Sequence, residues 1–325
     1  MIIISLLRDK EEYPMKKLIL IPLAAASLMA DTVSTDINTE NVITQERTWY
    51  EVAMLKPEKP LTDDELRNRV IYTNVIGAGV IALWGTAFWD YFTIAPVTND
   101  EGWFGEDTKY GGADKMGHMY STYLWSLGFS SLYEYWGMSE DDALLYGPLT
   151  SWVFQGMMEV GDSFSETQGF SYEDLVMNTV GAAFYYVREK YPSVKSKLDF
   201  RLEYIPDFSS DVDFFTQYNS MKYLFALKFS GFESMEDTPM KYFELQAGYY
   251  TRGYSESENY DTKERVGYLG IGINSSEVLK AMGWQKTSKI LNYYQLPYTY
   301  IPAGYDFDSQ SYVAPYSRPY FGDRK

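Results

Sequence analysis

Three apolar segments of the chain each carry a pair of polar side chains suited to acid–base chemistry or to metal binding. The pairs are Asp114 with His118, Glu159 with Asp162, and Asp174 with Asn178. The members of each pair are three or four residues apart, which places them on the same face of an α-helix. Each pair lies near one end of its segment, so the three pairs come together if those helix ends meet.

The first pair contains His118, the only histidine among the 325 residues. An imidazole changes charge near neutral pH and serves as a general base or as a metal ligand. In a catalytic site Asp114 would orient the ring, with Glu159 or Asp162 as the acid or as further ligands. His118, Glu159 and Asp162 are therefore the candidate ligands of a divalent metal ion. The chain lacks the H-E-x-x-H spacing of zinc hydrolases and the G-x-S-x-G turn of serine hydrolases.

The same carboxylates also have a structural interpretation. Asp114 can be the N-cap of a helix, and Asp174 can complete a capping box with Ser171. Glu159 and Asp162 can form a solvated helix end.

The imidazole and the amide have structural interpretations as well. Asn178 has apolar neighbours, and a buried amide needs hydrogen-bond partners. A lone histidine is most often a satisfied structural residue, and we expect a hydrogen bond between Asp114 and His118 that points inward. The sequence favours a structural polar cluster and leaves a catalytic one as the alternative.

The first half of the chain predicts four helices, packed as an apolar bundle over residues 62–190. The first begins with a capping box at Thr62 and Glu65 and continues through residues 71–89, which carry no charge. At about 1.5 Å per residue this uncharged stretch nearly spans the hydrocarbon of a bilayer. The other helices are predicted from 114 to about 135, from 140 to about 159 and from 172 to about 190. Their uncharged stretches are shorter, which suits buried helices or helices that dip into a membrane.

The second half changes to a period of two, which indicates antiparallel strands with one buried face. Strands are predicted at 198–205, 221–229, 242–250 and 265–274, with a short helix at 275–282. On this pattern Phe225 and Leu245 face the core, whereas Lys222 and Glu244 face solvent. Four prolines after residue 296 predict an irregular, tyrosine-rich tail over 291–325. The fold class is thus α+β: a helical domain, an antiparallel β region over 198–290, and the tail.

The N-terminal region predicts export from the cytoplasm. From Met15 the chain reads "MKKLILIPLAAASLMAD", in which two lysines precede an apolar run and a zone of small residues. We interpret residues 1–30 as a signal peptide, with Met15 as the true start, and residues 31–61 as a linker. The expected location is the periplasm of a bacterial cell envelope, at the inner or the outer membrane.

Composition narrows the classes of partner. There is no cysteine, which excludes disulfides and the attachment of a lipid at a cysteine. Anchoring is therefore expected from the helices or from an aromatic surface, since 18% of the residues are aromatic. A net charge of −17 argues against nucleic acid and against bulk attraction to an anionic surface. We expect a membrane or a lipid as the partner.

The polar residues together resemble the motifs of a known family. The patterns D-K-x-G-H, E-x-G-D and S-x-x-D-x-x-x-N-x-x-G are similar to those of the YfiM-like bacterial envelope proteins. The residues that carry the resemblance are Asp114, Lys115, His118, Glu159, Asp162, Ser171, Asp174, Asn178 and Gly181. They lie within about 110–190, and a D-K-x-x-H helix start is also distantly similar to VanZ-like membrane proteins. The resemblance implies a periplasmic protein and no particular activity, and this chain departs from the lipoprotein members because it has no lipid-attachment cysteine.

Three functions stay open on these observations. The favoured one is a non-catalytic envelope protein, in which the polar cluster locks the helical bundle. The second is a hydrolase, with or without a divalent metal, that acts on a lipid head group or an envelope phosphate. The third is an outer-membrane β-barrel, although four predicted strands are fewer than the usual minimum of about eight.

Overall fold

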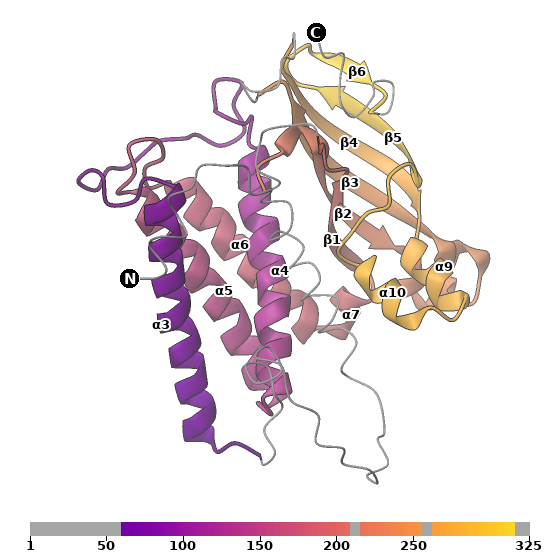
Figure 1. Ribbon diagram of the computed structural model, residues 1–325. Helices are drawn as coiled ribbons and strands as arrows, with labels where there is room; N and C mark the ends of the chain where they lie inside the picture. The colour runs from indigo at the N-terminus through magenta and orange to yellow at the C-terminus, as the bar shows by residue number, and fades with distance from the viewer. Residues whose placement is uncertain (1–59, 209–214, 255–261, 316–325) are drawn as a thin grey trace. The chain divides into compact units, whose positions relative to one another are not determined.

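The computed structural model describes residues 60–208, 215–254 and 262–315 (Figure 1). The predicted signal peptide, nearly all of the predicted linker and residues 316–325 of the predicted tail lie outside these ranges. Within them the chain forms four long helices followed by one antiparallel sheet, which confirms the α+β class.

Three of the four long helices begin where their capping residues predict. The four are α3 (Asp63–Phe88), α4 (Ala113–Tyr135), α5 (Glu140–Asp162) and α6 (Tyr172–Lys190). Thr62 and Glu65 form the expected capping box at α3. The side chains of Ser139 and Ser171 each accept a backbone N–H from the first turn of α5 and α6. Local hydrogen bonding therefore fixes the starts of three helices.

Helix α4 packs against both α5 and α6 at short range, because glycines face it from each neighbour. A Cβ atom added at Gly181 would lie 2.2 Å from the carbonyl oxygen of Met119, and one added at Gly147 would lie 2.6 Å from the backbone nitrogen of Ser130. Helix α3 packs on α5, where Asn74 donates a hydrogen bond to Thr150 (3.2 Å). The polar residues of α4–α6 are thus held on closely spaced backbones.

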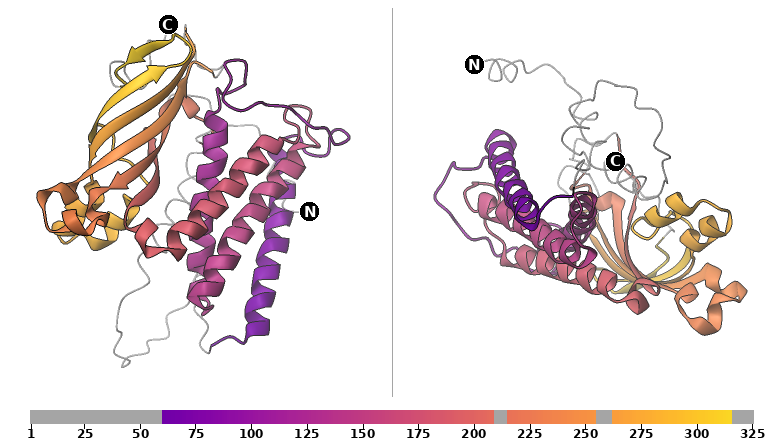
Figure 2. Two further views of the ribbon diagram at one scale, coloured as in Figure 1. Left: turned by 180° about the vertical axis from the view of Figure 1, so that it is seen from behind. Right: turned by 90° about the horizontal axis from the view of Figure 1, so that it is seen from below.

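The sheet is a meander in which each strand pairs with its neighbour in the sequence. Its strands are β1 (Leu198–Tyr204), β2 (Met221–Lys228), β3 (Phe243–Arg252), β4 (Glu264–Ile273), β5 (Tyr300–Asp306) and β6 (Ser311–Val313). Short helices accompany them: α7 (Pro192–Lys195), α8 (Glu233–Glu236), α9 (Ser275–Ala281) and α10 (Gln285–Ile290). The sheet meets the bundle through β1 and β2, where Phe200 and Tyr223 pack against Tyr120 of α4 (Figure 2).

The prediction of an irregular tail is wrong for residues 300–313, which form β5 and β6. Pro302 pairs with Gly270 of β4 inside the ladder. The register of β6 covers only Gly304–Asp306, so in the described chain β5 has a partner on one side alone at Pro302. A proline is tolerated at such an edge because the missing N–H has no ladder partner to lose.

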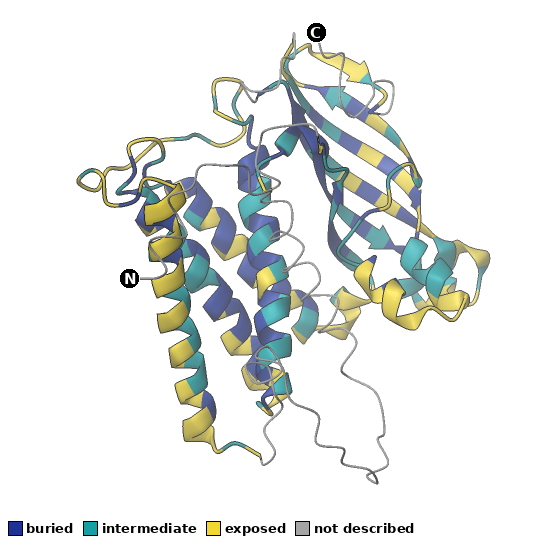
Figure 3. Ribbon diagram, in the orientation of Figure 1, coloured by how far each residue is buried: buried dark blue, intermediate teal, exposed yellow. Residues whose placement is uncertain are grey.

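The predicted orientation is wrong for Lys222, Glu244 and Leu245, whereas Phe225 packs against the hydrophobic core as predicted. Lys222 and Glu244 are buried, with 1% and 0% of their surface exposed, whereas Leu245 is 44% exposed and Phe225 is half-buried (Figure 3). The buried charges are paired across strands: Arg201 donates to Glu244 (2.7 Å) as well as to a second buried carboxylate. The alternation of apolar and polar residues in the sequence identifies the two faces of each strand. It does not show which face is buried, because the burial of Glu244 depends on its pairing with Arg201, which lies far away in the sequence.

Candidate functional site

The predicted site residues lie at the end of the bundle where α3 and α5 end and α4 and α6 begin (Figure 1). Two loops, 89–112 and 163–171, cross this end. They are tied together by backbone hydrogen bonds from Val97 to Ser163 (2.8 Å) and from Asn99 to Phe170 (2.9 Å). The loops and the helix ends together position the polar side chains.

We define the polar cluster as Glu101, Asp114, Lys115, His118, Glu159, Asp162 and Asp174. Glu101 comes from the 89–112 loop, and the others come from the ends of α4, α5 and α6. Glu101, His118 and Asp162 are half-buried, and the remaining members are buried. The cluster therefore gathers five carboxyl groups around one lysine and one imidazole.

The lysine half of the cluster is a well-paired network. The Lys115 ammonium, which is fully buried, lies 2.6 Å from Glu101, 2.9 Å from Asp114 and 2.9 Å from Asp174. Burial would lower the pKa of Lys115, but the charges of Asp114 and Asp174 outweigh it and raise that pKa. Burial would likewise raise the pKa of Glu101, and its hydrogen bond with Lys115 lowers it instead. One ammonium thus joins the 89–112 loop to the first turns of α4 and α6.

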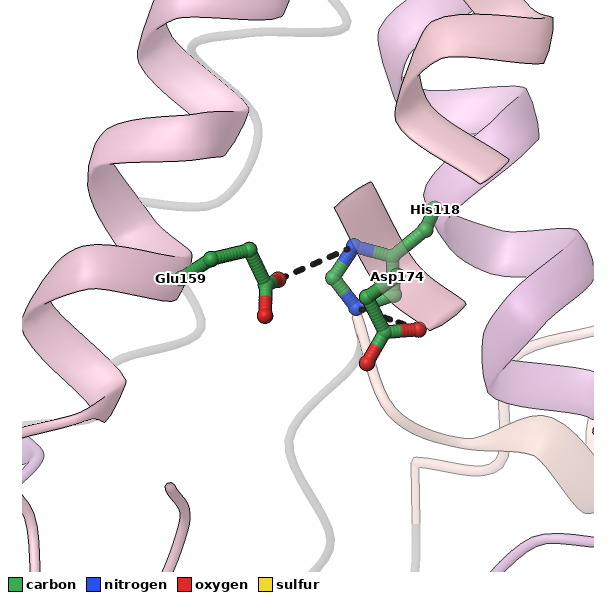
Figure 4. Close-up of side chains that lie close together, drawn as sticks. All are labelled: His118, Glu159 and Asp174. Carbon is green, nitrogen blue, oxygen red and sulfur yellow. Dashed lines mark ion pairs between the residues drawn. The ribbon is translucent and has the colours of Figure 1, made fainter. Parts of the chain in front are cut away.

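The histidine half is more loosely arranged. The His118 imidazole lies between two carboxyl groups, with Nδ1 3.6 Å from Glu159 and Nε2 3.7 Å from Asp174 (Figure 4). Both distances are too long for good hydrogen bonds. The buried Nδ1 of His118 has no hydrogen-bond partner within the described chain, whereas Oδ1 of Asp174 is already in the ion pair with Lys115. The imidazole side chain is 26% exposed, so this half of the cluster is reachable from solvent.

The carboxyl groups around His118 hold protons more tightly than usual. Burial, with added repulsion from Asp174 and Asp162, raises the pKa of Glu159 to about 9. Burial also raises the pKa of Asp162 to about 6, although the Tyr91 hydroxyl and His118 oppose the shift. The pKa of Asp174 is raised by burial too, against the opposing charges of His118 and Lys115. Carboxyl groups therefore outnumber basic groups on this side of the cluster and are retained in part in the protonated form.

This arrangement fits a divalent cation. One ligand atom each from His118, Glu159 and Asp174 lies within 4.8 Å of the other two. Imidazole nitrogen and carboxylate oxygen are ligands for Zn²⁺ and Mn²⁺. A cation would also take the place of protons on these carboxyl groups and supply the unpaired Nδ1 atom of His118 with a partner. The predicted ligand set of His118, Glu159 and Asp162 differs in one member, since Asp174 takes the third position and Asp162 lies beside Tyr91.

Two expectations for individual residues are corrected by the geometry. Asp114 does not cap α4, because the N-cap is Gly112 in a left-handed conformation (φ 85°). The described ion pairs of His118 are with Glu159 and Asp174, while Asp114 pairs with Lys115 in place of the expected Asp114–His118 hydrogen bond.

Asn178 has no described contact with the ionisable groups of the polar cluster and instead joins two helices. It is fully buried, and its carbonyl accepts a hydrogen bond from Thr122 of α4 (2.8 Å). Gly181, one turn later, permits the close contact with Met119. The N-x-x-G part of the sequence motif therefore serves the packing of α6 on α4.

Sequence reasoning missed Glu101 and the central part that Lys115 plays. Glu101 lies in a loop without periodicity, so no pattern connected it to the helices. Lys115 lies next to Asp114 in the sequence, and its pairing with Asp174 spans 59 residues. The adjacent Asp114 and Lys115 at the helix start were the one local signal for the role of Lys115.

Exposed apolar and aromatic residues surround the site. Among the described residues, α3 is the one helix long and apolar enough to cross a bilayer, and most of its apolar surface is exposed. Exposed aromatic side chains follow at its C-terminal end, in the 89–112 loop and at the start of α6: Trp89, Phe92, Trp103, Phe104 and Tyr172. Aromatic residues concentrate in this way at membrane–water interfaces.

No curated protein and no solved structure matches the chain. The resemblance to YfiM-like and VanZ-like proteins stays a prediction. Residues 100–190, which contain the whole polar cluster, match the sequence model of a family described as a predicted periplasmic lipoprotein (DUF2279), and this confirms the membrane-associated periplasmic location predicted from the sequence.

Proposed function

We propose that this envelope protein binds a divalent cation between His118, Glu159 and Asp174 and uses it to hydrolyse a phosphate ester in the head group of a membrane lipid. The observation that carries the proposal is the composition of the cluster: five carboxyl groups share one lysine and one imidazole. Charges buried in such excess are costly unless they are protonated or meet a cation.

The division of the cluster into two halves supports a chemical role for His118. Lys115 is saturated with carboxylate partners and has no capacity for a substrate. The imidazole is partly exposed and loosely held between Glu159 and Asp174. Side chains with perturbed pKa values and incomplete pairing gather at functional sites.

Each member of the histidine half has a role in this proposal. His118, Glu159 and Asp174 hold the cation. A bound divalent cation would lower the pKa of a water molecule and polarise a phosphate oxygen. Asp162, whose pKa of about 6 lies near neutral pH, accepts the proton from the attacking water. The Lys115 network holds the first turns of α4 and α6 against the 89–112 loop.

The position of the site favours a lipid over a soluble phosphate. The polar cluster lies at the end of α3 where its exposed apolar surface gives way to Trp89 and Phe92. If α3 lies in the membrane, these aromatic residues lie at the level of the head groups. A head-group phosphate is then the nearest substrate to the exposed edge of His118.

Metal titration tests the proposal. The full chain is treated with chelator and titrated by calorimetry with Zn²⁺, Mn²⁺ and Mg²⁺ in turn. We expect one bound ion per chain, with affinity at least about tenfold weaker in His118→Asn and in Glu159→Gln. Asp141→Asn, at an exposed carboxylate elsewhere on α5, is the control and should bind as wild type. A folded wild-type protein that binds none of the three ions would refute the proposal.

A vesicle assay then tests the reaction. The protein is reconstituted in vesicles that contain anionic phospholipids, and release of phosphate or head group is followed with and without the bound ion. Release should require the ion and should be lost in His118→Asn. If the protein binds the ion but releases neither phosphate nor head group, the hydrolase activity is refuted and only cation binding stands.

A purely structural cluster is the second candidate, and the Lys115 network favours it. On that interpretation His118→Ala should reduce stability, His118→Asn should reduce it less, and any cellular phenotype should follow stability. A stable, well-expressed His118→Asn protein that has lost its function would exclude a structural role, because asparagine cannot act as a base near neutral pH.

A further inference from the structure

One face of the sheet presents an uncovered apolar surface. We define the outer sheet patch as Phe243, Leu245, Leu269, Ile271, Ile273 and Ile301, all of which are exposed. Leu245, Ile271 and Ile301 form one row across β3, β4 and β5, because the ladder pairs Leu245 with Ile271 and Ile271 with Ile301. Leu269 is 68% exposed and Ile301 82%. The patch is therefore a continuous surface across three strands.

The opposite face of the same strands is buried; it is polar along the first half of β3, and on β4 and β5 it carries Val266, Tyr268 and Tyr300 of a buried core cluster. Glu244 and Gln246, which alternate with Leu245 along β3, are inside and bonded to each other (2.7 Å). Arg201 joins them from β1 through its salt bridge to Glu244. In water a sheet with one covered face keeps its apolar residues on that face. Strands that contact lipid have their polar residues inside and their apolar residues outside. The first half of β3 has this arrangement.

The bundle covers only part of the outer face. On β1 and β2 the aromatic side chains Phe200 and Phe225 pack against Phe184 of α6. The patch continues this same face onto β3, β4 and β5, beyond those helix contacts. Soluble monomers rarely leave a contiguous apolar area of this kind exposed.

Aromatic side chains lie at one end of the patch. Tyr305, the last residue but one of β5, packs edge-on against Phe307, with ring centroids 5.6 Å apart, and against Tyr312 of β6, with ring centroids 5.4 Å apart. Phe307 and Tyr312 are both exposed. A band of aliphatic residues that ends in an aromatic group is typical of a protein surface that passes from the acyl region to the head groups.

We propose that the outer sheet patch lies in the acyl region of the membrane with which the protein associates, and that Tyr305, Phe307 and Tyr312 lie at its interface. The occupant is lipid, because the exposed aliphatic row, the polar inner side of β3 and the aromatic end all match lipid and the protein is membrane-associated. The sheet then contacts the bilayer independently of α3. The proposal does not depend on the metal site.

Site-specific fluorescence tests this proposal, and the absence of cysteine makes each introduced thiol unique. Leu269→Cys and Ile301→Cys are labelled with an environment-sensitive dye in the full chain and reconstituted in phosphatidylethanolamine–phosphatidylglycerol vesicles. Glu236→Cys, exposed on α8, is the matched control. At the two patch positions we expect a blue shift, loss of fluorescence with nitroxide-labelled acyl chains, and protection from aqueous iodide. The control should show the reverse.

Two results would overturn the proposal. Equal quenching by iodide at Leu269, Ile301 and Glu236 would place the patch in water. Efficient thiol cross-linking between copies at Ile301 in vesicles, with no acyl-chain quenching, would show that a second copy of the chain covers the patch. Neither readout depends on metal binding, so the outcome is separate from that of the hydrolase proposal.

Discussion

Nδ1 of His118 lies 3.6 Å from the carboxyl group of Glu159, a group that holds its proton up to a pH of about 9 because it is buried beside other acids. This pairing of the sole imidazole with a carboxyl of raised pKa makes the stability of the site depend on pH. It also makes proton and cation competitors for the same oxygen atoms.

Metal-free protein should become less stable as pH rises from about 4.5 to about 9. Glu159 has a pKa of about 9 in the folded chain against an ordinary value of 4.5, so the folded state binds the proton more tightly than the unfolded state does. The stability that this difference provides is present below a pH of about 4.5 and is lost as pH rises to about 9. Thermal unfolding in the presence of chelator measures the trend. Glu159→Gln should flatten it, and an unchanged slope in that variant would show that Glu159 is not its source.

Replacing Lys115 should be far more damaging than replacing an exposed lysine of a neighbouring helix. Lys115→Met leaves the buried carboxylates of Asp114 and Asp174 without their shared ammonium, at a cost of about 3–5 kcal/mol. Lys190→Met, in an exposed pair with Asp141, should change stability little. Chemical denaturation of both variants in detergent provides the comparison, and equal effects would argue against a buried network.

Adjacent residues of β3 should differ sharply in their sensitivity to truncation. Glu244→Ala removes the partner of Arg201 inside the sheet and should cost about 3–5 kcal/mol. Leu245→Ala, on the outer face, should cost about 0.5 kcal/mol or less in detergent. A larger loss for Leu245→Ala would reverse the assignment of the two faces.

Two glycine-to-alanine changes test the packing of α6 on α4. Gly181→Ala should destabilise the fold by about 1–3 kcal/mol, because the new Cβ would meet the carbonyl oxygen of Met119 at 2.2 Å. Gly128→Ala, within α4, meets nothing within 4 Å and should stabilise the helix by about 0.5–1 kcal/mol. Differential scanning calorimetry should give shifts of opposite sign, and a stabilising Gly181→Ala would contradict the close helix contact.

The four long helices could be predicted because their signals are local. Thr62, Ser139 and Ser171 mark three helix starts through hydrogen bonds that span three residues. The first four strands followed from alternation over eight to ten residues. The start of α4 has no side-chain cap, and there the sequence pointed to Asp114 in place of Gly112.

The inner face of the sheet and the pairing within the cluster could not be predicted in the same way. Arg201 and Glu244 are 43 residues apart, so the sequence pattern treats both as surface charges. His118 and Glu159 lie on helices whose relative rotation depends on tertiary packing, and Glu101 lies on a loop. The sequence placed polar residues near helix ends that meet, but whether Asp162 or Asp174 lies within reach of His118 and Glu159 depends on that rotation.

The meander has a consequence for the order in which the exported chain assembles. Each strand can add to the one before it as soon as both have emerged, since neighbours in the sheet are neighbours in the sequence. The outer edge of β1 is different: the N–H of Leu202 donates to the carbonyl of Tyr293, and the carbonyl of Leu202 accepts from the N–H of Gln295 (both 3.0 Å). These two partners follow β4 and two short helices. Until those residues arrive, β1 presents an open edge that can recruit a strand from another chain. A chain released before residue 293 would therefore be prone to self-association through its first strand. Residues 293–295 cover the edge of β1 that would otherwise stay open.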